Sequence, residues 1–462
     1  MNYAAPLTQT AEESRKNRTW EIQPDAEAAL RKFVEQALSS NKAANEYAEV
    51  LLEGCAVRMR DIIDYVETTD KDLLARLSAN GWQDDGGVLR HPEGYFPEFL
   101  TSERDVIWFR AENIEAFEKA TSLGLDIEGP RHGPFRRAIV FEGSPAFGVV
   151  QRSGHIGFEV PDTPAGTIRL ARLHGQAFGA RRRQFSDVSE GLDHTQKLVS
   201  AAVSDLGPHW ACDIWLRAER AYWMSRCDAG RHQWRRQLSV GVGWANIDHH
   251  TYDGSREHFR KTVEILETLG YELREMLYAG ELAGWGSQVL EQPALKSTIF
   301  ADVDLAPEEL TIDFAHEPLP PLDKHRRAGV LSILHGESIL EAGLNHVAAL
   351  YDQERLRSQL AESGVSMMPP FSDFDHLYQE LTLGERVPVD PKRVDQLEGE
   401  GHLPRDEAED IRLNGAIATH LENIERNFGY KGFNKAGIDG VLRKLDPRTY
   451  GKNRDVVSGS QS

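Results

Sequence analysis

The sequence contains few cysteines, three in 462 residues, at Cys55, Cys212 and Cys227. Their spacing forms neither a CxxC pair nor a zinc-ligand pattern, which argues against a disulfide scaffold and against a structural zinc site. An odd, sparse set of thiols is typical of a reducing compartment. We therefore expect a cytoplasmic protein.

Positive charge is also in deficit, since the formal net charge is −20 and the pI is about 5.3. Nucleic acid or an anionic membrane would require a strong local basic patch, and "GARRRQ" at 179–184 is short and lacks interleaved aromatic residues. No apolar run approaches transmembrane length, and the first residues lack the apolar core of a signal peptide. These absences predict a protein that binds neither nucleic acid nor membrane.

Two common cofactor motifs are missing as well. No GxGxxG follows a predicted strand, and the sequence contains no P-loop. Hydride transfer from a dinucleotide and phosphoryl transfer from a nucleotide therefore have no support in this chain.

Hydrophobic residues make up 40% of the chain, which is enough for a substantial core. Amphipathic periodicity and runs of β-branched and aromatic residues divide the chain into five parts. We expect an N-terminal helical segment at 1–87, a strand-rich module at 88–164, a helical insertion at 165–236, a second module at 237–304 and a mainly helical region at 305–462.

The two strand-rich segments repeat one order of elements. "DVIWFRAENIEAFEKATSLGL" reads strand, helix, glycine, and so does "NIDHHTYDGSREHFRKTVEILETLGY"; about three strands follow each. Internal repetition of this kind is stronger evidence than any single propensity. It predicts an α+β fold in which two βαβββ modules lie side by side and form a cupped mixed sheet.

His249 and His250 stand where the first strand of the second module ends. The helix at 255–269 is well specified, with Asp253 or Ser255 as its cap and Gly270 at its end. A histidine at this position is either a hydrogen-bonded core residue or a metal ligand. Because side chains alternate along a strand, only one of the pair points into the cup.

These residues resemble the vicinal-oxygen-chelate superfamily, in which "DH" closes a strand, a helix ending in "LGY" follows, and the histidine binds a divalent metal. Asp248–His249 and 269–271 match that pattern. More narrowly, "IDHHT" followed by "VLEQPALKS" (289–297) resembles the 2-oxoadipate dioxygenase/decarboxylase (hydroxyglutarate synthase) family. The resemblance implies Fe(2+) held by two histidines and a carboxylate, with His249 as one ligand.

The resemblance also suggests the other ligands. "YQELTLGERVPVDPKR" (378–393) places Glu380 at the carboxylate position, and Glu291 is the alternative. The family's other histidine has no counterpart in "SERDVIWFR". His155 in "VVQRSGHIGFEV" is the best substitute, because it alternates with other polar residues on one side of an apolar strand. His132 and His91 are the alternatives.

A 2-oxo acid also needs cations and polar groups fixed in position around it, because arginine grips a carboxylate through two hydrogen bonds. The candidate substrate-binding residues are Gln151, Arg136, Arg152, Gln292 and Lys296. Asn434 and Lys435, in the glycine-rich segment "GFNKAGIDG", are candidates for a lid over the pocket.

The resemblance therefore implies an iron-dependent dioxygenase and decarboxylase that acts on a small 2-oxo acid, similar to 2-oxoadipate, with O2 as co-substrate. The alternatives are a metal-dependent isomerase or lyase of the same fold, with Glu291 as its base, and a non-catalytic binding protein. The tryptophan stripe at 208–227 is either a homo-oligomer interface or a helix face in the core.

Overall fold

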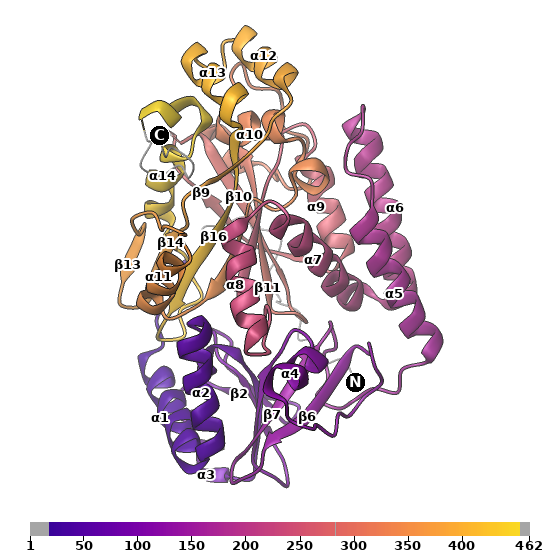
Figure 1. The fold of residues 1–462 in the computed structure, drawn as a ribbon, viewed down its shortest axis with the longest axis vertical. Coiled ribbons are helices and arrows are strands. Elements are labelled where there is room, and N and C mark those ends of the chain that lie inside the picture. The colour runs from indigo at the N-terminus through magenta and orange to yellow at the C-terminus, as the bar shows by residue number, and fades with distance from the viewer. Residues whose placement is uncertain (1–17, 282, 453–462) are drawn as a thin grey trace.

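The computed structural model describes residues 18–281 and 283–452. In this part of the chain, two mixed β-sheets are surrounded by helices, so the fold class is α+β as predicted. Figure 1 shows the N-terminal sheet with helices α1 to α4 at one end of the molecule and the second sheet above it.

Seven strands of the described chain form the first sheet, in the order β2-β3-β4-β1-β5-β7-β6. The strands are β1 (Ile63–Thr68), β2 (Gln83–Asp85), β3 (Val88–Arg90), β4 (Glu98–Thr101), β5 (Val106–Arg110), β6 (Phe135–Phe141) and β7 (Ala146–Arg152). The central pair β1 and β5 is antiparallel, and each of these strands has a parallel neighbour, β4 and β7 respectively.

The second sheet has nine described strands, in the order β13-β14-β16-β12-β8-β11-β10-β9, with β15 paired to β16. They are β8 (Ile247–Asp253), β9 (Glu272–Tyr278), β10 (Trp285–Gln292), β11 (Ser297–Asp304), β12 (His346–Leu350), β13 (Ser372–Phe374), β14 (Leu377–Leu381), β15 (Glu385–Val387) and β16 (Ala416–Arg426). Here too the central pair, β8 and β12, is antiparallel, with parallel neighbours β11 and β16.

Each sheet is thus built from two modules that begin strand–helix–strand–strand. The helices that follow the four opening strands are α3 (Lys71–Ala79), α4 (Ile114–Thr121), α9 (Phe259–Thr268) and α11 (Gln353–Glu362). The two modules predicted from the sequence, 88–164 and 237–304, lie in different sheets. Each of them pairs with a further module that is adjacent to it in the chain. Strand β1 is the partner of β5, and β12 is the partner of β8.

The remaining helices pack around the sheets. They are α1 (Pro24–Ser40), α2 (Lys42–Cys55), α5 (Ala165–Ala180), α6 (Val188–Leu206), α7 (Pro208–Met224), α8 (Asp228–Ser239), α10 (Arg327–His335), α12 (Pro391–Gly399), α13 (Arg405–Asn414) and α14 (Lys435–Lys444), with short turns η2 (Met59–Ile62), η3 (Pro307–Thr311), η4 (Ser338–Ala342) and η5 (Pro447–Lys452). Helices α12 and α13 interrupt the last module before β16. No described helix has both the length and the apolar character needed to cross a bilayer.

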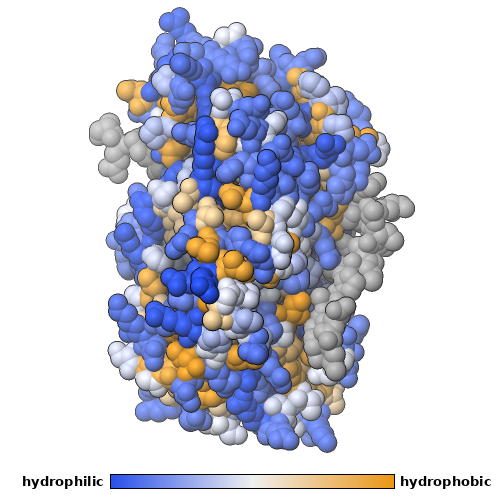
Figure 2. Space-filling view, turned by 90° about the vertical axis from the view of Figure 1, so that its right-hand side faces the viewer, coloured by the Kyte–Doolittle hydropathy of each residue, from blue (hydrophilic) through white to orange (hydrophobic). Residues whose placement is uncertain are grey.

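The tryptophan stripe of α7 belongs to the core. Trp210, Trp215 and Trp223 are all buried, and the last two have no exposed surface. On the face shown in Figure 2, hydrophilic residues predominate and hydrophobic residues form small separate groups. The stripe therefore packs inside the protein.

Candidate metal centre

Three buried side chains meet at the centre of the second sheet. They are His249 on β8, His346 on β12 and Glu422 on β16, and these three strands are adjacent. Ala348 of β12 is the register partner of both His249 and Glu422, so His249, Ala348 and Glu422 form a row across the sheet. His346 lies two residues before Ala348 and therefore shares its face. The small Ala348 side chain lies between the two outer residues of this row.

The donor atoms are close enough to share one ion. Glu422 Oε2 lies 3.3 Å from His249 Nε2 and 3.2 Å from His346 Nε2, and the two Nε2 atoms are 3.4 Å apart. Ligands about 2.1 Å from one divalent metal are separated by roughly 3.0–3.4 Å in octahedral or tetrahedral arrangements. The two histidines and the carboxylate therefore fit the donor set of a facial triad.

Outer hydrogen bonds fix the orientation of each donor. The Asp248 carboxylate accepts a hydrogen bond from His249 Nδ1 at 2.8 Å, and Arg426 donates to the same carboxylate through Nε at 2.6 Å. Gln379 Nε2 donates to Glu422 Oε1 at 2.8 Å. A proton held on Nδ1 leaves the lone pair of His249 Nε2 available to a metal, as in many metal-binding histidines.

The electrostatics of the group favour a cation. Burial alone would lower the pKa of His249, but Glu422 and Asp248 together raise it to about 9. Burial would raise the pKa of Glu422, yet the two histidines hold it at about 2, so this carboxyl remains charged. A buried carboxylate facing two imidazole nitrogens attracts either a proton or a metal ion.

Replacing Asp248 with asparagine tests the outer hydrogen bonds. Asp248→Asn is expected to weaken metal binding about 10–100-fold, because His249 loses the negatively charged partner that fixes its ring and raises its basicity. Competition with a chromophoric chelator gives the affinity. The same substitution at the exposed Asp373 of β13 is the control. Equal affinity in both variants would contradict the role of Asp248.

A small cavity opens beside the three donors. Its volume is about 40 Å³, and its aromatic walls are Trp285, Phe300, Phe371 and Phe433. The Phe433 ring packs edge-on against His249 at 5.3 Å. A space of this size accommodates only a few water molecules in this conformation.

Two charged groups also face this cavity. Arg327 donates to Asp253 through Nη1 at 3.1 Å, and its Nη2 lies 3.8 Å from Asp302. Burial and the neighbouring Asp253 raise the pKa of Asp302 to about 7, although Arg327 opposes the shift. The cavity therefore offers a cation and a carboxyl group that can exchange a proton near neutral pH.

The structure brings His249 into this group, but neither His155 nor Glu380 lies there. His155 follows β7 of the first sheet, and its Nε2 contacts the Glu159 carbonyl at 3.1 Å. Glu380 of β14 is paired with Arg357 and accepts a hydrogen bond from Asn423. Its register partner is Asn423, the residue after Glu422, so Glu380 points to the other face of the sheet.

The alternative ligands are also placed elsewhere. His132 is exposed in the loop before β6, and His91 packs edge-on against Trp82 at 4.9 Å. Glu291 lies on β10, with its carboxylate 3.8 Å from Arg274 Nε. Both His91 and Glu291 line a larger cavity between the two sheets.

All five predicted substrate residues have protein partners. Gln151 accepts from the backbone N–H of Ile114, Arg136 pairs with Glu115, Arg152 pairs with Asp64, and Gln292 donates to His209. The fifth, Lys296, lies 3.5 Å from Glu98. None of these five residues lines the cavity beside His249.

The predicted lid segment does reach this cavity. Asn434 lines it and caps α14, accepting a hydrogen bond from Gly437, while Lys435 points away and pairs with Glu275. Phe433, Ile438 and Leu442 of the same segment complete the wall.

Sequence reasoning missed His346, Glu422, Gln379 and Arg327. A signal was present, because "NHVAALYDQERLRSQLAESG" repeats the strand, helix, glycine order of the segment that begins at Asn246. The α12–α13 insertion separates this segment from β16 and hides the module's last strand.

No family model and no curated protein matches this chain. Among solved structures, a mutant of 4-hydroxymandelate synthase from Streptomyces coelicolor is 13% identical, with 75% of this chain and 96% of that one covered and a TM-score of 0.30. Methylmalonyl-CoA epimerase from Mycobacterium tuberculosis is 12% identical over 39% of this chain and 88% of that one, with a TM-score of 0.21. Uncharacterized protein YdcJ from Shigella flexneri is 10% identical over 62% and 86%, with a TM-score of 0.24. Similarities this remote do not support an inference about function.

Proposed function

We propose that this protein is a divalent-metal enzyme, specifically a ferrous dioxygenase that oxidatively decarboxylates a small 2-oxo acid. The observation that carries the proposal is the buried group of His249, His346 and Glu422, with donor atoms 3.2–3.4 Å apart beside a cavity. The "IDHHT" resemblance supports the same chemistry. Bound ferrous iron would have positions open for a chelating 2-oxo acid and for O2, and it would supply electrons to O2.

The surrounding side chains have separate tasks in this proposal. Gln379 holds Glu422, and Asp248 holds His249, so both donors stay oriented while substrate enters. Arg327 is the cation in the cavity that can face a second carboxylate of the substrate. The four aromatic side chains exclude water from the reacting groups.

Substrate entry requires the cavity to expand, because about 40 Å³ is far below the volume of pockets that enclose small-molecule ligands, which is on the order of 300 Å³ or more. The segment 433–442 is the element that can open it. It contributes four of the cavity's residues and consists of a single short helix with its preceding turn. Phe433 would then close over the bound substrate.

Oxygen dependence tests the reaction class. A dicarboxylic 2-oxo acid added anaerobically to the ferrous protein is expected to give a charge-transfer absorption band without product. Admission of air should then release CO2 in a one-to-one ratio with the O2 consumed, as measured with an oxygen electrode and labelled substrate. Turnover without oxygen would refute the dioxygenase proposal and leave the metal site standing.

A metal-dependent isomerase or lyase is the second candidate, and one observation favours it. Asp302 is a buried carboxyl group in the same cavity, which is where such an enzyme needs a general base. Glu291, the base expected from the sequence, lines the larger cavity instead. Solvent-deuterium exchange into a 2-oxo acid without oxygen uptake would select this candidate.

A further inference from the structure

A second polar cavity lies on the other side of β8. Its volume is about 100 Å³, and His250 lines it, whereas His249 lines the metal cavity. The two consecutive histidines therefore face different cavities, as alternation along a strand requires. The walls come from the end of β5, from α7 and from the turn between β10 and β11.

The walls of this cavity carry an excess of positive charge. The charged residues that line it are Arg110, Arg152, Arg217, Arg220 and Lys296, against Glu112 and Asp213. Asp64 lies behind the wall and pairs with both Arg110 and Arg152. Glu98 lies 3.5 Å from Lys296, and with Asp64 and Glu98 both included, cations outnumber carboxylates by one. Buried positive charge without compensation is costly, so an anion is the expected occupant.

Among the cations of this cavity, Arg220 has the most distant carboxylate partner. Its side chain is only 8% exposed, and its nearest carboxylate, Glu112, is 3.7 Å away. Its Nε is buried without a hydrogen-bond partner, and its Nη1 faces His250 Nε2 at 3.4 Å. Arg217, by contrast, is held by Asp213 at 2.7 Å. Arg220 therefore lines the cavity with a buried guanidinium that has no close carboxylate, and such a group favours an anionic ligand.

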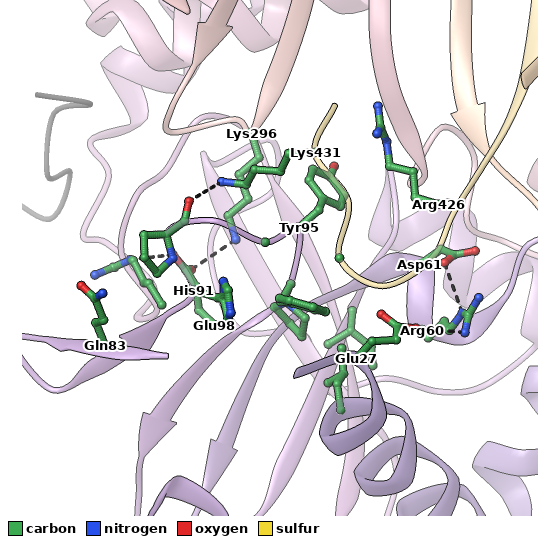
Figure 3. Close-up of a pocket in the computed structure, with 18 of the residues that line it drawn as sticks. Glu27, Arg60, Asp61, Gln83, His91, Tyr95, Glu98, Lys296, Arg426 and Lys431 are labelled. Carbon is green, nitrogen blue, oxygen red and sulfur yellow. Dashed lines mark hydrogen bonds and ion pairs between the residues drawn. The ribbon is translucent and has the colours of Figure 1, made fainter. Parts of the chain in front are cut away.

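Lys296 stands between this cavity and the larger one, of about 1010 Å³, that lies between the two sheets. Figure 3 shows Lys296 extending into the larger cavity, with its amine near Glu98, and Arg110 also lines both spaces. The backbone of Lys296 is left-handed, with φ of 53°. Such a conformation is unfavourable for a lysine and is found more often at functional sites.

We propose that the cavity behind β8 is an oxyanion site, which binds a phosphate or carboxylate group between Arg220, Arg110 and Lys296, with access from the larger cavity. A planar guanidinium matches a polyatomic oxyanion better than a halide, because two hydrogen bonds can form to two oxygens. The available volume suits an end group rather than a whole metabolite. The site is independent of the proposed metal chemistry, since it lies on the opposite face of the strand.

Calorimetry with inorganic phosphate and with acetate tests the site, at constant ionic strength in a chloride buffer. Wild-type protein is expected to bind at least one of the two anions with one site per chain and an increase in melting temperature. Lys296→Gln should weaken binding on the order of ten-fold or more, the effect of losing one charge-assisted hydrogen bond. Lys431→Gln removes the same charge from the wall of the larger cavity alone and should leave binding within about two-fold.

Further variants and the metal-free protein make the test decisive. Arg220→Lys keeps the charge but not the planar fork, and it is expected to weaken binding while the protein remains folded by circular dichroism. Metal-free and metal-loaded protein should bind equally well. Tighter binding of phosphate or of acetate identifies the end group. No heat with either anion, equal affinity in Lys296→Gln and wild type, or binding only with metal present would overturn the proposal.

Discussion

A chain carrying His346→Ala is expected to lose its bound metal, whereas His155→Ala should retain one equivalent per chain. Removing one of three donors should cost more than the roughly 10–100-fold loss of affinity that follows removal of an outer hydrogen-bond partner. The variant also leaves Glu422 facing a single histidine, 3.3 Å away. Metal content of gel-filtered protein, measured by mass spectrometry beside a circular-dichroism check of folding, gives the result.

Two further histidine variants, on β8, serve as comparisons in this experiment. His249→Ala should behave like His346→Ala, while His250→Ala should keep its metal, because His250 lines the cavity on the other face of β8. Equal metal content in all four variants would show that the group on β8, β12 and β16 does not hold the metal. Loss of metal in His155→Ala alone would restore the ligand expected from the sequence.

Glu422→Gln is expected to abolish oxygen-dependent turnover without unfolding the protein. The neutral amide is a poor ligand for a hard ferrous ion, and the shape of the side chain is preserved. Glu380→Gln is the matched control, since that residue lies on the neighbouring strand and can still bond to Asn423. Its rate should stay within about three-fold of wild type, because it removes no charge from the metal cavity.

The comparison of rates decides between the two strands. A large loss of turnover in Glu380→Gln with an active Glu422→Gln would transfer the carboxylate role to β14. Loss in both would indicate that the pairing of β14 with β16 is itself needed for the site. Metal content measured on the same samples separates loss of the ion from loss of chemistry.

Local features of the second sheet followed from the sequence. The apolar residues expected on one face of the helix after β8, Phe259, Val263, Leu266 and Leu269, are all buried. Its start differs from the expectation: α9 begins at Phe259, because the Ser255 hydroxyl and backbone N–H both bond to the Glu337 carboxylate and hold residues 255–258 in a turn. That partner is distant in the sequence, so no local pattern could have predicted it.

The candidate metal donors were hidden for a similar reason. His346 and Glu422 meet because β12 pairs in parallel with β16, although three helices and three strands lie between them in the chain. Periodicity reports which face of a strand is apolar, but it does not report which strands are neighbours. Glu380 illustrates this limit, because it lies on β14 and its register partner on β16 is Asn423, so its side chain points to the face opposite Glu422.

The two sheets share one arrangement of strands, yet their central residues differ in kind. Where the second sheet carries donors, the first has Tyr65 and Trp108 packed with Phe158 on one face. The face of the first sheet that carries Tyr65 and Trp108 therefore belongs to a packed core, whereas the face of the second sheet that carries His249 borders a cavity.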